Sequence, residues 1–230
     1  MGDHEADQVR EALSERGEPS EEAVEEGRRL FARPCLFMAG ADSVAALPPA
    51  ILPEVAFTGR SNVGKSSLLN ALVGQKSLAR ISRTPGRTQQ INFFRLDGRL
   101  DLVDLPGYGH ARVAKTAQSA WTDLTRAYLR GRATLRRVLL LVDARHGLKP
   151  TDRDFMALLD RSAVSYQIVL TKADALPPSA RVIMREAVER ESARHGAAFP
   201  IVALTSARSG EGIEHLRASL AALASPEPLR

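Results

Sequence analysis

The sequence contains one cysteine, no long apolar run and no signal-peptide core. A single cysteine, Cys35, cannot form an intrachain disulfide, which excludes a disulfide-stapled secreted scaffold. No stretch approaches the roughly 18 apolar residues of a transmembrane helix, and the acidic N-terminus lacks an apolar signal segment. The histidines are scattered and show no metal-ligand spacing. We therefore expect a cytoplasmic protein without a membrane anchor.

Positive charge is present in excess, and it is unevenly spread. Residues 1–30 hold 10 acids and 4 bases, whereas the rest of the chain holds 17 acids and 28 bases. A basic body favours a polyanionic partner such as RNA, and an acidic leader either shields that surface or serves as a solubilising tail. We expect residues 1–30 to form an acidic, largely mobile extension with some helix near residues 21–30. Residues 31–230 should form one domain.

Strand and helix patterns alternate through the rest of the chain. Strands are predicted at residues 55–58, 91–96, 99–104, 138–142, 167–171 and 201–204, and helices at residues 65–73, 116–130, 151–162, 178–195 and 212–224. Asp97-Gly98 predicts a tight hairpin between two of the strands. The order indicates a three-layer α/β fold with helices on both faces of a mostly parallel, six-stranded sheet that has one antiparallel edge strand. Ligands of such sheets bind at the carboxyl ends of the strands.

A complete G-x-x-x-x-G-K-[ST] phosphate-binding loop lies between a strand and a helix. Its residues are Gly59, Arg60, Ser61, Asn62, Val63, Gly64, Lys65 and Ser66. Glycines let the backbone N–H groups turn toward a phosphate, and the helix N-terminus faces the same anion. Lys65 can reach the β- and γ-phosphates, and the Ser66 hydroxyl can bind Mg²⁺.

Three further motifs follow strands and select among nucleotide-binding proteins. They are a D-x-x-G motif (Asp104, Leu105, Pro106, Gly107), a T-K-x-D motif (Thr171, Lys172, Ala173, Asp174) and a short T-S-A motif (Thr205, Ser206, Ala207). Asp104 can hold Mg²⁺ through water, and the Gly107 N–H can contact a γ-phosphate. The Asp174 carboxylate accepts two hydrogen bonds, which guanine offers and adenine does not. Lys172 would stack over the base and brace the phosphate loop, and the T-S-A backbone would support the base.

A switch segment is expected between the first helix and the hairpin. Thr84 and Thr88 both have the hydroxyl needed to complete a Mg²⁺ shell. With the neighbouring motifs, this segment resembles the EngB (YsxC/YihA) family of bacterial GTPases over roughly residues 33–225. The resemblance implies a P-loop G domain of the TRAFAC type, with Thr88 as the Mg²⁺-binding switch threonine. The implied nucleotide contacts of the switch are Gly86, Arg87, Thr88, Gln89 and Gln90.

The same resemblance implies a biological role. Members bind GTP and GDP with Mg²⁺, act in assembly of the large ribosomal subunit, and are needed for normal division-septum formation. The expected partner is therefore a large-subunit precursor with its rRNA and ribosomal proteins, and we expect the protein to be a monomer. Two alternatives stay open: a GTP/GDP-sensing scaffold with negligible turnover at the division site, and a small-molecule kinase.

Hydrolysis should be slow without assistance. The water-positioning Gln that many GTPases carry after D-x-x-G is replaced by Tyr108, which has no amide. Lys65, Thr88 and Asn62 are the catalytic candidates, and Asn62 resembles an asparagine that helps bind K⁺ in potassium-stimulated GTPases. His110 is a candidate base, although a histidine in such a loop is more often polar surface.

Arginines in two clusters are candidates for RNA contact. One cluster comprises Arg80, Arg83 and Arg87, and the other comprises Arg126, Arg130, Arg132, Arg136 and Arg137. Guanidinium groups pair well with phosphates. If these clusters contact rRNA, charge reversal at Arg130 and Arg132 should weaken particle binding and lower its salt dependence. A solvated basic face is the alternative.

Overall fold

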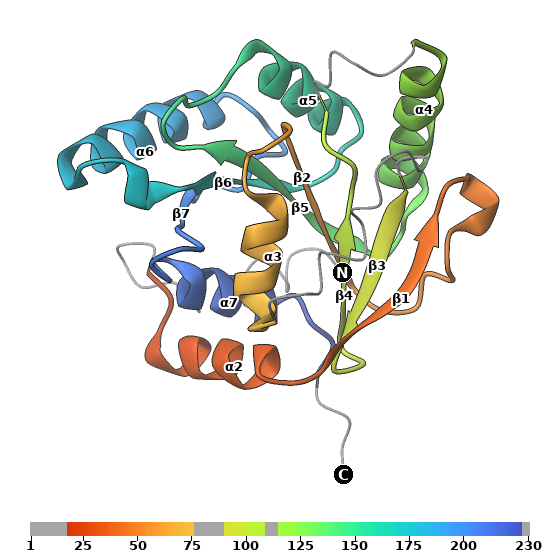
Figure 1. Ribbon diagram of the computed structural model, residues 1–230, viewed down its shortest axis with the longest axis horizontal. Coiled ribbons are helices and arrows are strands. Elements are labelled where there is room, and N and C mark those ends of the chain that lie inside the picture. Colours follow the sequence, from red (N-terminus) through yellow and green to blue (C-terminus); the bar gives the residue numbers. More distant parts are fainter. Residues whose placement is uncertain (1–17, 76–89, 109–114, 227–230) are drawn as a thin grey trace.

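The computed structural model describes residues 18–75, 90–108 and 115–226, with the backbone alone for residues 115–122 (Figure 1). The strands are β1 (Cys35–Ala41), β2 (Glu54–Gly59), β3 (Ile91–Leu96), β4 (Leu100–Asp104), β5 (Leu135–Asp143), β6 (Tyr166–Thr171) and β7 (Ala203–Leu204). The α-helices are α2 (Glu21–Phe31), α3 (Lys65–Val73), α4 (Lys115–Gly131), α5 (Pro150–Arg161), α6 (Pro178–Ser192) and α7 (Ile213–Ala221). Short 3₁₀ helices are η1 (Val44–Ala46) and η3 (Ala173–Ala175).

The described strands form one sheet in the order β1-β3-β4-β2-β5-β6-β7. Strands β4, β2, β5, β6 and β7 pair in parallel, while β3 pairs antiparallel with both β1 and β4. The α/β class and the mostly parallel sheet are confirmed. The hairpin is confirmed as well, since Asp97 and Gly98 both take the positive φ angles of a tight turn.

The strand count differs from the prediction, because the sheet has seven strands and the antiparallel strand β3 is not at its edge. Strand β1 covers the outer side of β3, with a register shift between Phe37 and Ala39. The side chains of Leu36, Phe37 and Met38 are all exposed. Three apolar exposed positions in succession, together with a bulge, remove the two-residue alternation by which an edge strand is recognised.

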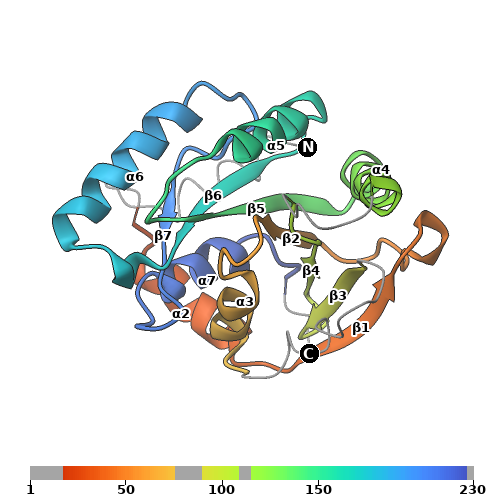
Figure 2. The same cartoon turned by 45° about the horizontal axis from the view of Figure 1, so that its top comes forward.

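Helices cover both faces of the sheet (Figure 2). On one face, α4, α5 and α6 pack over inward-facing side chains such as Val138 and Leu140. On the other face, α2, α3 and α7 pack over Leu139 and Leu141. Successive residues of β5 therefore enter opposite cores, as the pleat of a strand buried on both faces requires. This burial holds the sheet rigid beneath the loops at its edge.

The folded part of the chain begins earlier than residue 31. Helix α2 starts inside the segment assigned to the extension, where the Ser20 hydroxyl accepts a hydrogen bond from the Ala23 N–H at 3.2 Å. Leu30 and Phe31 are buried, and a Cβ added at Gly27 would lie 2.6 Å from the backbone nitrogen of Ala218 in α7. The close packing of α2 on α7 places residues 21–30 with the domain, and residues 1–17 lie outside the described residues.

The side chain of the single cysteine, Cys35, is buried at the start of β1. Burial, with a smaller effect of the Asp101 charge, raises the pKa of the Cys35 thiol to about 12. A thiol with such a pKa is protonated at neutral pH and is a poor nucleophile. Cys35 therefore acts as a small apolar side chain.

The sheet order brings several polar loops to one edge. Because β4, β2, β5, β6 and β7 are adjacent and parallel, the segments after their carboxyl ends emerge side by side. Four of these segments carry the motifs found in the sequence. No helix in the described ranges is both long and apolar enough to cross a bilayer.

Candidate functional site

The phosphate-loop motif connects the carboxyl end of β2 to the first turn of α3. Gly64 takes φ +105°, and Asn62 takes φ +62°, so the loop turns through left-handed backbone that glycine adopts at little cost. No side chain in the described part of the chain caps α3. The N–H groups of its first turn are thus left to bind an anion.

The D-x-x-G segment lies directly against this loop. The Leu105 N–H donates to the carbonyl of Phe57 at 2.9 Å, and the Tyr108 N–H donates to the carbonyl of Gly59 at 3.2 Å. A Cβ at Gly107 would come within 2.9 Å of that same Gly59 oxygen, so the close approach requires glycine. Asp104 is buried and forms an ion pair with the Lys65 ammonium. The two motifs form one continuous polar surface.

The side chain of Tyr108 points away from that surface and into the core. Its hydroxyl donates to Asp152 Oδ1 at 2.8 Å, and its ring stacks on Phe155 with centroids 4.9 Å apart. Burial, with the nearby Asp152 carboxylate, raises the pKa of Tyr108 far above its ordinary value. The phenol therefore stays a neutral donor. Asp152 was not identified from the sequence, since only the fold brings it next to Tyr108.

The T-K-x-D segment is tied to the phosphate loop by two side chains. The Thr171 hydroxyl donates to the carbonyl of Val63 at 2.6 Å. Lys172 takes φ +59°, and its ammonium donates to the carbonyl of Asn62 at 2.6 Å. The prediction that Lys172 braces the phosphate loop is confirmed. The ammonium also contacts Asp143 Oδ2 at 2.8 Å, a partner that the sequence motifs did not indicate.

Asp174 is oriented by the T-S-A segment. The Ser206 hydroxyl donates to Asp174 Oδ1 at 2.6 Å and accepts from the backbone N–H groups of Arg208 and Ser209 at 3.2 and 3.1 Å. The carbonyl of Thr205 accepts from the Ala173 N–H at 3.1 Å. The two predicted base-binding segments therefore meet. The sequence predicted support from the backbone of residues 205–207, and the structure adds a hydrogen bond from the Ser206 side chain to Asp174.

Several predicted site residues lie outside the described residues. These are Thr84, Gly86, Arg87, Thr88 and Gln89 of the switch segment, Arg80 and Arg83 of the first arginine cluster, and His110. Gln90 is described and is partly buried beside β1, where a Cβ at Gly40 would lie 2.7 Å from its side-chain oxygen. The structure thus brings together the loops after β2, β4, β6 and β7.

The residues that are described fit a magnesium ion by their donor chemistry. The Ser66 hydroxyl is in the first turn of α3, and the Asp104 carboxylate at the end of β4 pairs with the neighbouring Lys65. Hydroxyl and carboxylate oxygens are the hard donors that Mg²⁺ prefers, commonly in combination with substrate phosphates. Ser66 and Asp104 could thus contribute to a magnesium site at the phosphate loop.

The second arginine cluster is divided by the fold. Arg132 is largely buried and its Nε donates to Glu54 at 2.9 Å. Arg137 is buried, donates to Ser219 Oγ at 2.9 Å, and lies 4.0 Å above the Phe199 ring, with burial lowering its pKa to about 10. Neither guanidinium is available to RNA, so their assignment to an RNA surface is wrong. Arg126, Arg130 and Arg136 are exposed.

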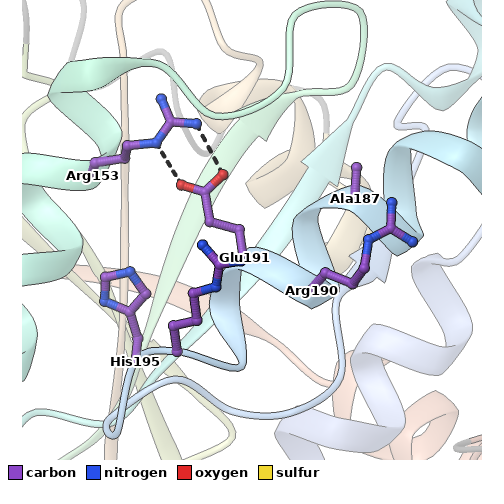
Figure 3. Close-up of a pocket in the computed structure, with 6 residues that line it drawn as sticks. Arg153, Ala187, Arg190, Glu191 and His195 are labelled. Atoms are coloured by element: carbon purple, nitrogen blue, oxygen red, sulfur yellow. Dashed lines mark hydrogen bonds and ion pairs between the residues drawn. The ribbon is translucent and has the colours of Figure 1, made fainter.

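Two cavities lie near or beyond the site. One, of about 210 Å³, is bounded by the phosphate loop, the end of β5 and the start of α5, with Asp143 and Lys172 in its wall. A larger one, of about 530 Å³, lies between α5 and α6 (Figure 3). There Arg153 reaches across to Glu191, with N–O distances of 2.5 and 2.9 Å. None of the residues lining this second cavity belongs to a nucleotide motif.

Comparison with known proteins agrees with this geometry. Residues 54–172 match a family model described as a 50S ribosome-binding GTPase. A probable GTP-binding protein EngB of Gluconobacter oxydans is 54% identical over 210 residues, covering 91% of this chain and 92% of the relative. The protein of the same description from Rhodospirillum rubrum is 56% identical over 214 residues, covering 91% and 93%.

Solved structures agree on the fold. A crystal structure of a probable GTP-binding protein engB superposes with a TM-score of 0.59 and 23% identity. The match covers 74% of this chain and 97% of that one. At this identity the likeness supports the G-domain fold, and the resemblance noted from the sequence motifs is confirmed by the relatives above.

Proposed function

The chain belongs to the EngB family of GTP-binding proteins and is a GTPase, and on that premise we propose that it is a nucleotide-controlled switch in late assembly of the bacterial large ribosomal subunit. The observation that carries the proposal is the convergence of the phosphate loop and residues 104–107, 171–174 and 205–207 at one edge of the sheet. Membership of a GTPase family sets aside the small-molecule kinase interpretation.

In the proposed site, the nucleotide lies across the carboxyl ends of β2, β5 and β6. Its phosphates rest on the N–H groups of the phosphate loop and on the Lys65 ammonium. Its guanine is read by Asp174, which the Ser206 hydroxyl orients at 2.6 Å. Lys172 lies between the base loop and the phosphate loop, since its ammonium contacts the carbonyl of Asn62. Residues 86–90 are proposed as the switch segment that contacts the nucleotide.

Magnesium would be held by Ser66 and Thr88, with Asp104 acting through water. The ion, when bound, neutralises charge on the phosphate oxygens. In this structure the Lys65 ammonium and the Asp104 carboxylate neutralise each other's charge. In the nucleotide complex each would have a different partner. Lys65 would turn to the phosphates and Asp104 to the metal's water shell.

The proposed hydrolysis is slow, because the residue after Gly107 cannot position water. Tyr108 is directed at Asp152 and Phe155 and is nearly fully buried. Asn62 is exposed in the phosphate loop, and its side chain forms no hydrogen bond to any described residue. A K⁺ ion bound there would offset negative charge on the phosphates. For this reason we keep Asn62 as a catalytic candidate beside Lys65 and Thr88.

The ribosomal part of the proposal is supported by charge and by family. The family model is described as ribosome-binding, and the chain outside its first 30 residues is basic. Arg126 and Arg130 on α4 are exposed and are available to phosphates. We place this action in the cytoplasm, with the effect on septation following from a shortage of ribosomes.

The deciding experiment is co-sedimentation with large-subunit precursors. We expect binding about tenfold tighter with a non-hydrolysable GTP analogue than with GDP, a typical coupling between two ligands of a switch. Equal binding in both states would contradict a switch, and absence of binding in both would remove the ribosomal role.

The second candidate is a GTP/GDP-sensing scaffold at the division site with negligible turnover. Tyr108 favours this candidate, because it occupies the position after Gly107 where many GTPases have a water-positioning amide. Its side chain has no amide and is directed at Asp152. Single-turnover GTP hydrolysis with and without precursor particles separates the two. Acceleration by particles supports the switch, whereas absence of turnover in both supports the scaffold.

A further inference from the structure

Asp143 lies at the carboxyl end of β5, between the strand that leads into the phosphate loop and the strand that leads into residues 171–174. Its side chain is 12% exposed and lies in the wall of the 210 Å³ cavity beside Asn62 and Lys172. It belongs to none of the four nucleotide motifs. Asp143 therefore lies between the phosphate loop and the guanine-reading loop, and it contacts Lys172 of the latter.

Both oxygens of the Asp143 carboxylate are occupied. Arg145 donates from Nε to Oδ1 at 2.9 Å, from Nη2 to Oδ2 at 2.7 Å, and from its backbone N–H to Oδ1 at 3.1 Å. The Lys172 ammonium contacts Oδ2 at 2.8 Å. A carboxylate clamped in this way has one orientation, so it offers Lys172 a partner at a defined place.

Lys172 is the residue whose geometry needs such a partner. It takes φ +59°, a left-handed conformation that is strained for a non-glycine residue. Its ammonium spans from Asp143 to the carbonyl of Asn62 at 2.6 Å. The side chain therefore bridges β5, the loop after β6 and the phosphate loop.

We propose that Asp143 is a positioning residue for nucleotide binding, which acts through Lys172 to hold the guanine-reading loop and the phosphate loop in fixed register. The proposal rests on the nucleotide site proposed above. Asp143 does not touch the nucleotide. It restrains Lys172, and Lys172 restrains the residues on either side of the base and phosphates.

The test is a double-mutant cycle read by dissociation of a fluorescent GDP from the full-length protein. Asp143→Asn removes the charge and keeps the size of the side chain. Lys172→Met keeps the apolar stem and removes the ammonium. We expect Asp143→Asn to accelerate GDP dissociation about tenfold in the wild-type chain and less than about twofold in the Lys172→Met chain, because the shared contact is already lost there.

Three further variants keep the outcome interpretable. Asp143→Glu retains the carboxylate on a longer side chain. The rate of GDP dissociation should therefore stay within about threefold of wild type, because the charged contact with Lys172 is kept in a shifted geometry. Asp154→Asn, an exposed acid on α5, is the matched control and should change nothing. The kcat at saturating GTP should change less than the GDP affinity, because the lost restraint acts on binding.

Two results would overturn the proposal: unchanged GDP dissociation in Asp143→Asn, or an equal acceleration in both backgrounds. A fall in melting temperature with unchanged dissociation would mean that Asp143 only stabilises the fold. Asp174→Asn tests the underlying site in the same assay. If it retains GDP affinity, the nucleotide site itself is misplaced, whereas if it loses affinity and Asp143→Asn does not, only the role of Asp143 fails.

Discussion

The Tyr108 hydroxyl donates a hydrogen bond to Asp152 Oδ1 at 2.8 Å, which joins the residue after Gly107 to the first turn of α5. The other oxygen of Asp152 accepts from the Lys149 N–H at 2.8 Å, where it caps the start of the helix. The D-x-x-G segment is therefore attached to two places at once. Its backbone is held by the phosphate loop, and its next side chain is held by α5.

Replacing Tyr108 by Phe should lower stability and leave GTP turnover unchanged. The variant keeps the ring on Phe155 but leaves one oxygen of the buried Asp152 without its donor, a loss of about 1–2 kcal/mol. A thermal melt of the GDP-bound protein should show the lower midpoint. A single-turnover assay should show hydrolysis within twofold of wild type. A large fall in hydrolysis at unchanged stability would give the phenol a catalytic role.

The environment of Asp143 predicts an acid-sensitive site. Burial is the largest single influence and alone would raise the pKa of the Asp143 carboxyl, but the hydrogen bonds from Arg145 and Lys172, together with the Lys172 charge, outweigh it and hold the pKa well below its ordinary range. Asp174 is the other acid close enough to act on Arg145. A lowered folded-state pKa adds stability that is fully present above the unfolded carboxyl pKa of about 4 and is lost as the pH falls toward the folded value.

Unfolding by denaturant at a series of pH values between 7 and 3 would check this effect. The free energy of unfolding of Asp143→Asn should decline less than that of the wild-type chain over the acid part of the range. Asp154→Asn, whose carboxylate is exposed on α5, provides the comparison. Parallel curves for the wild-type chain and Asp143→Asn would contradict the prediction.

Arg132 and Arg130 should give opposite results, although they are two residues apart. Among the described side chains, Arg132→Ala leaves the carboxylate of the fully buried Glu54 with the Tyr128 and Thr134 hydroxyls alone, so we expect a loss of about 3 kcal/mol in unfolding free energy. Arg130→Ala removes an exposed charge and should change stability by less than about 0.5 kcal/mol. Denaturant unfolding of the two variants measures this difference.

The same pair separates folding from ribosome binding. If Arg130 contacts rRNA, its replacement by Ala should weaken precursor binding and reduce the salt slope by about one. Binding is measured by co-sedimentation at several salt concentrations. Reversing both charges at once would confuse unfolding with lost contact, because Arg132 is a structural residue. An unchanged salt slope for Arg130→Ala would exclude that residue from the interface.

The contrast between Arg130 and Arg132 shows what the sequence can and cannot predict. Motifs with defined spacing predicted the loops after β2, β4, β6 and β7, since each motif requires a strand before it and a ligand-facing loop after it. Charge clusters carry no such requirement. Whether an arginine on α4 or just after its end faces solvent or Glu54 depends on contacts such as that of Arg132 with Glu54, 78 positions apart.

Asp143 and Asp152 were missed for the same reason. Each acts through a partner brought close by the sheet order, Lys172 in one case and Tyr108 in the other. Strand β1 was missed because its exposed apolar residues and bulge hide the alternation of an edge strand. Local patterns thus predicted the positions of the motifs, and long-range packing determined which side chains support them.

Asp174 makes a specific prediction about the base. Asp174→Asn replaces a two-acceptor group with one acceptor and one donor, so the variant should bind GDP weakly and bind xanthosine diphosphate better, because xanthine has a carbonyl where guanine has its amine. The Ser206 hydroxyl remains in place to orient the new side chain. Competition between the two nucleotides for the variant and wild-type proteins measures the exchange of preference. Retention of guanine preference would place the base elsewhere.

Asn62 makes the last prediction, which concerns the source of catalysis. Its backbone is held by Lys172 at φ +62°, and its side chain has no described partner, so it is free to bind a cation beside the phosphates. GTP turnover should be faster in KCl than in NaCl at equal ionic strength, by about a hundredfold if the cation offsets phosphate charge as one oxyanion-type contact does at the lower limit. Asn62→Ala should remove the difference and leave GDP affinity within about twofold, because the Asn62 carbonyl that Lys172 contacts is retained. Equal rates in the two salts would instead assign the missing charge to the precursor particle, whose addition should then accelerate the wild-type chain and Asn62→Ala to the same extent.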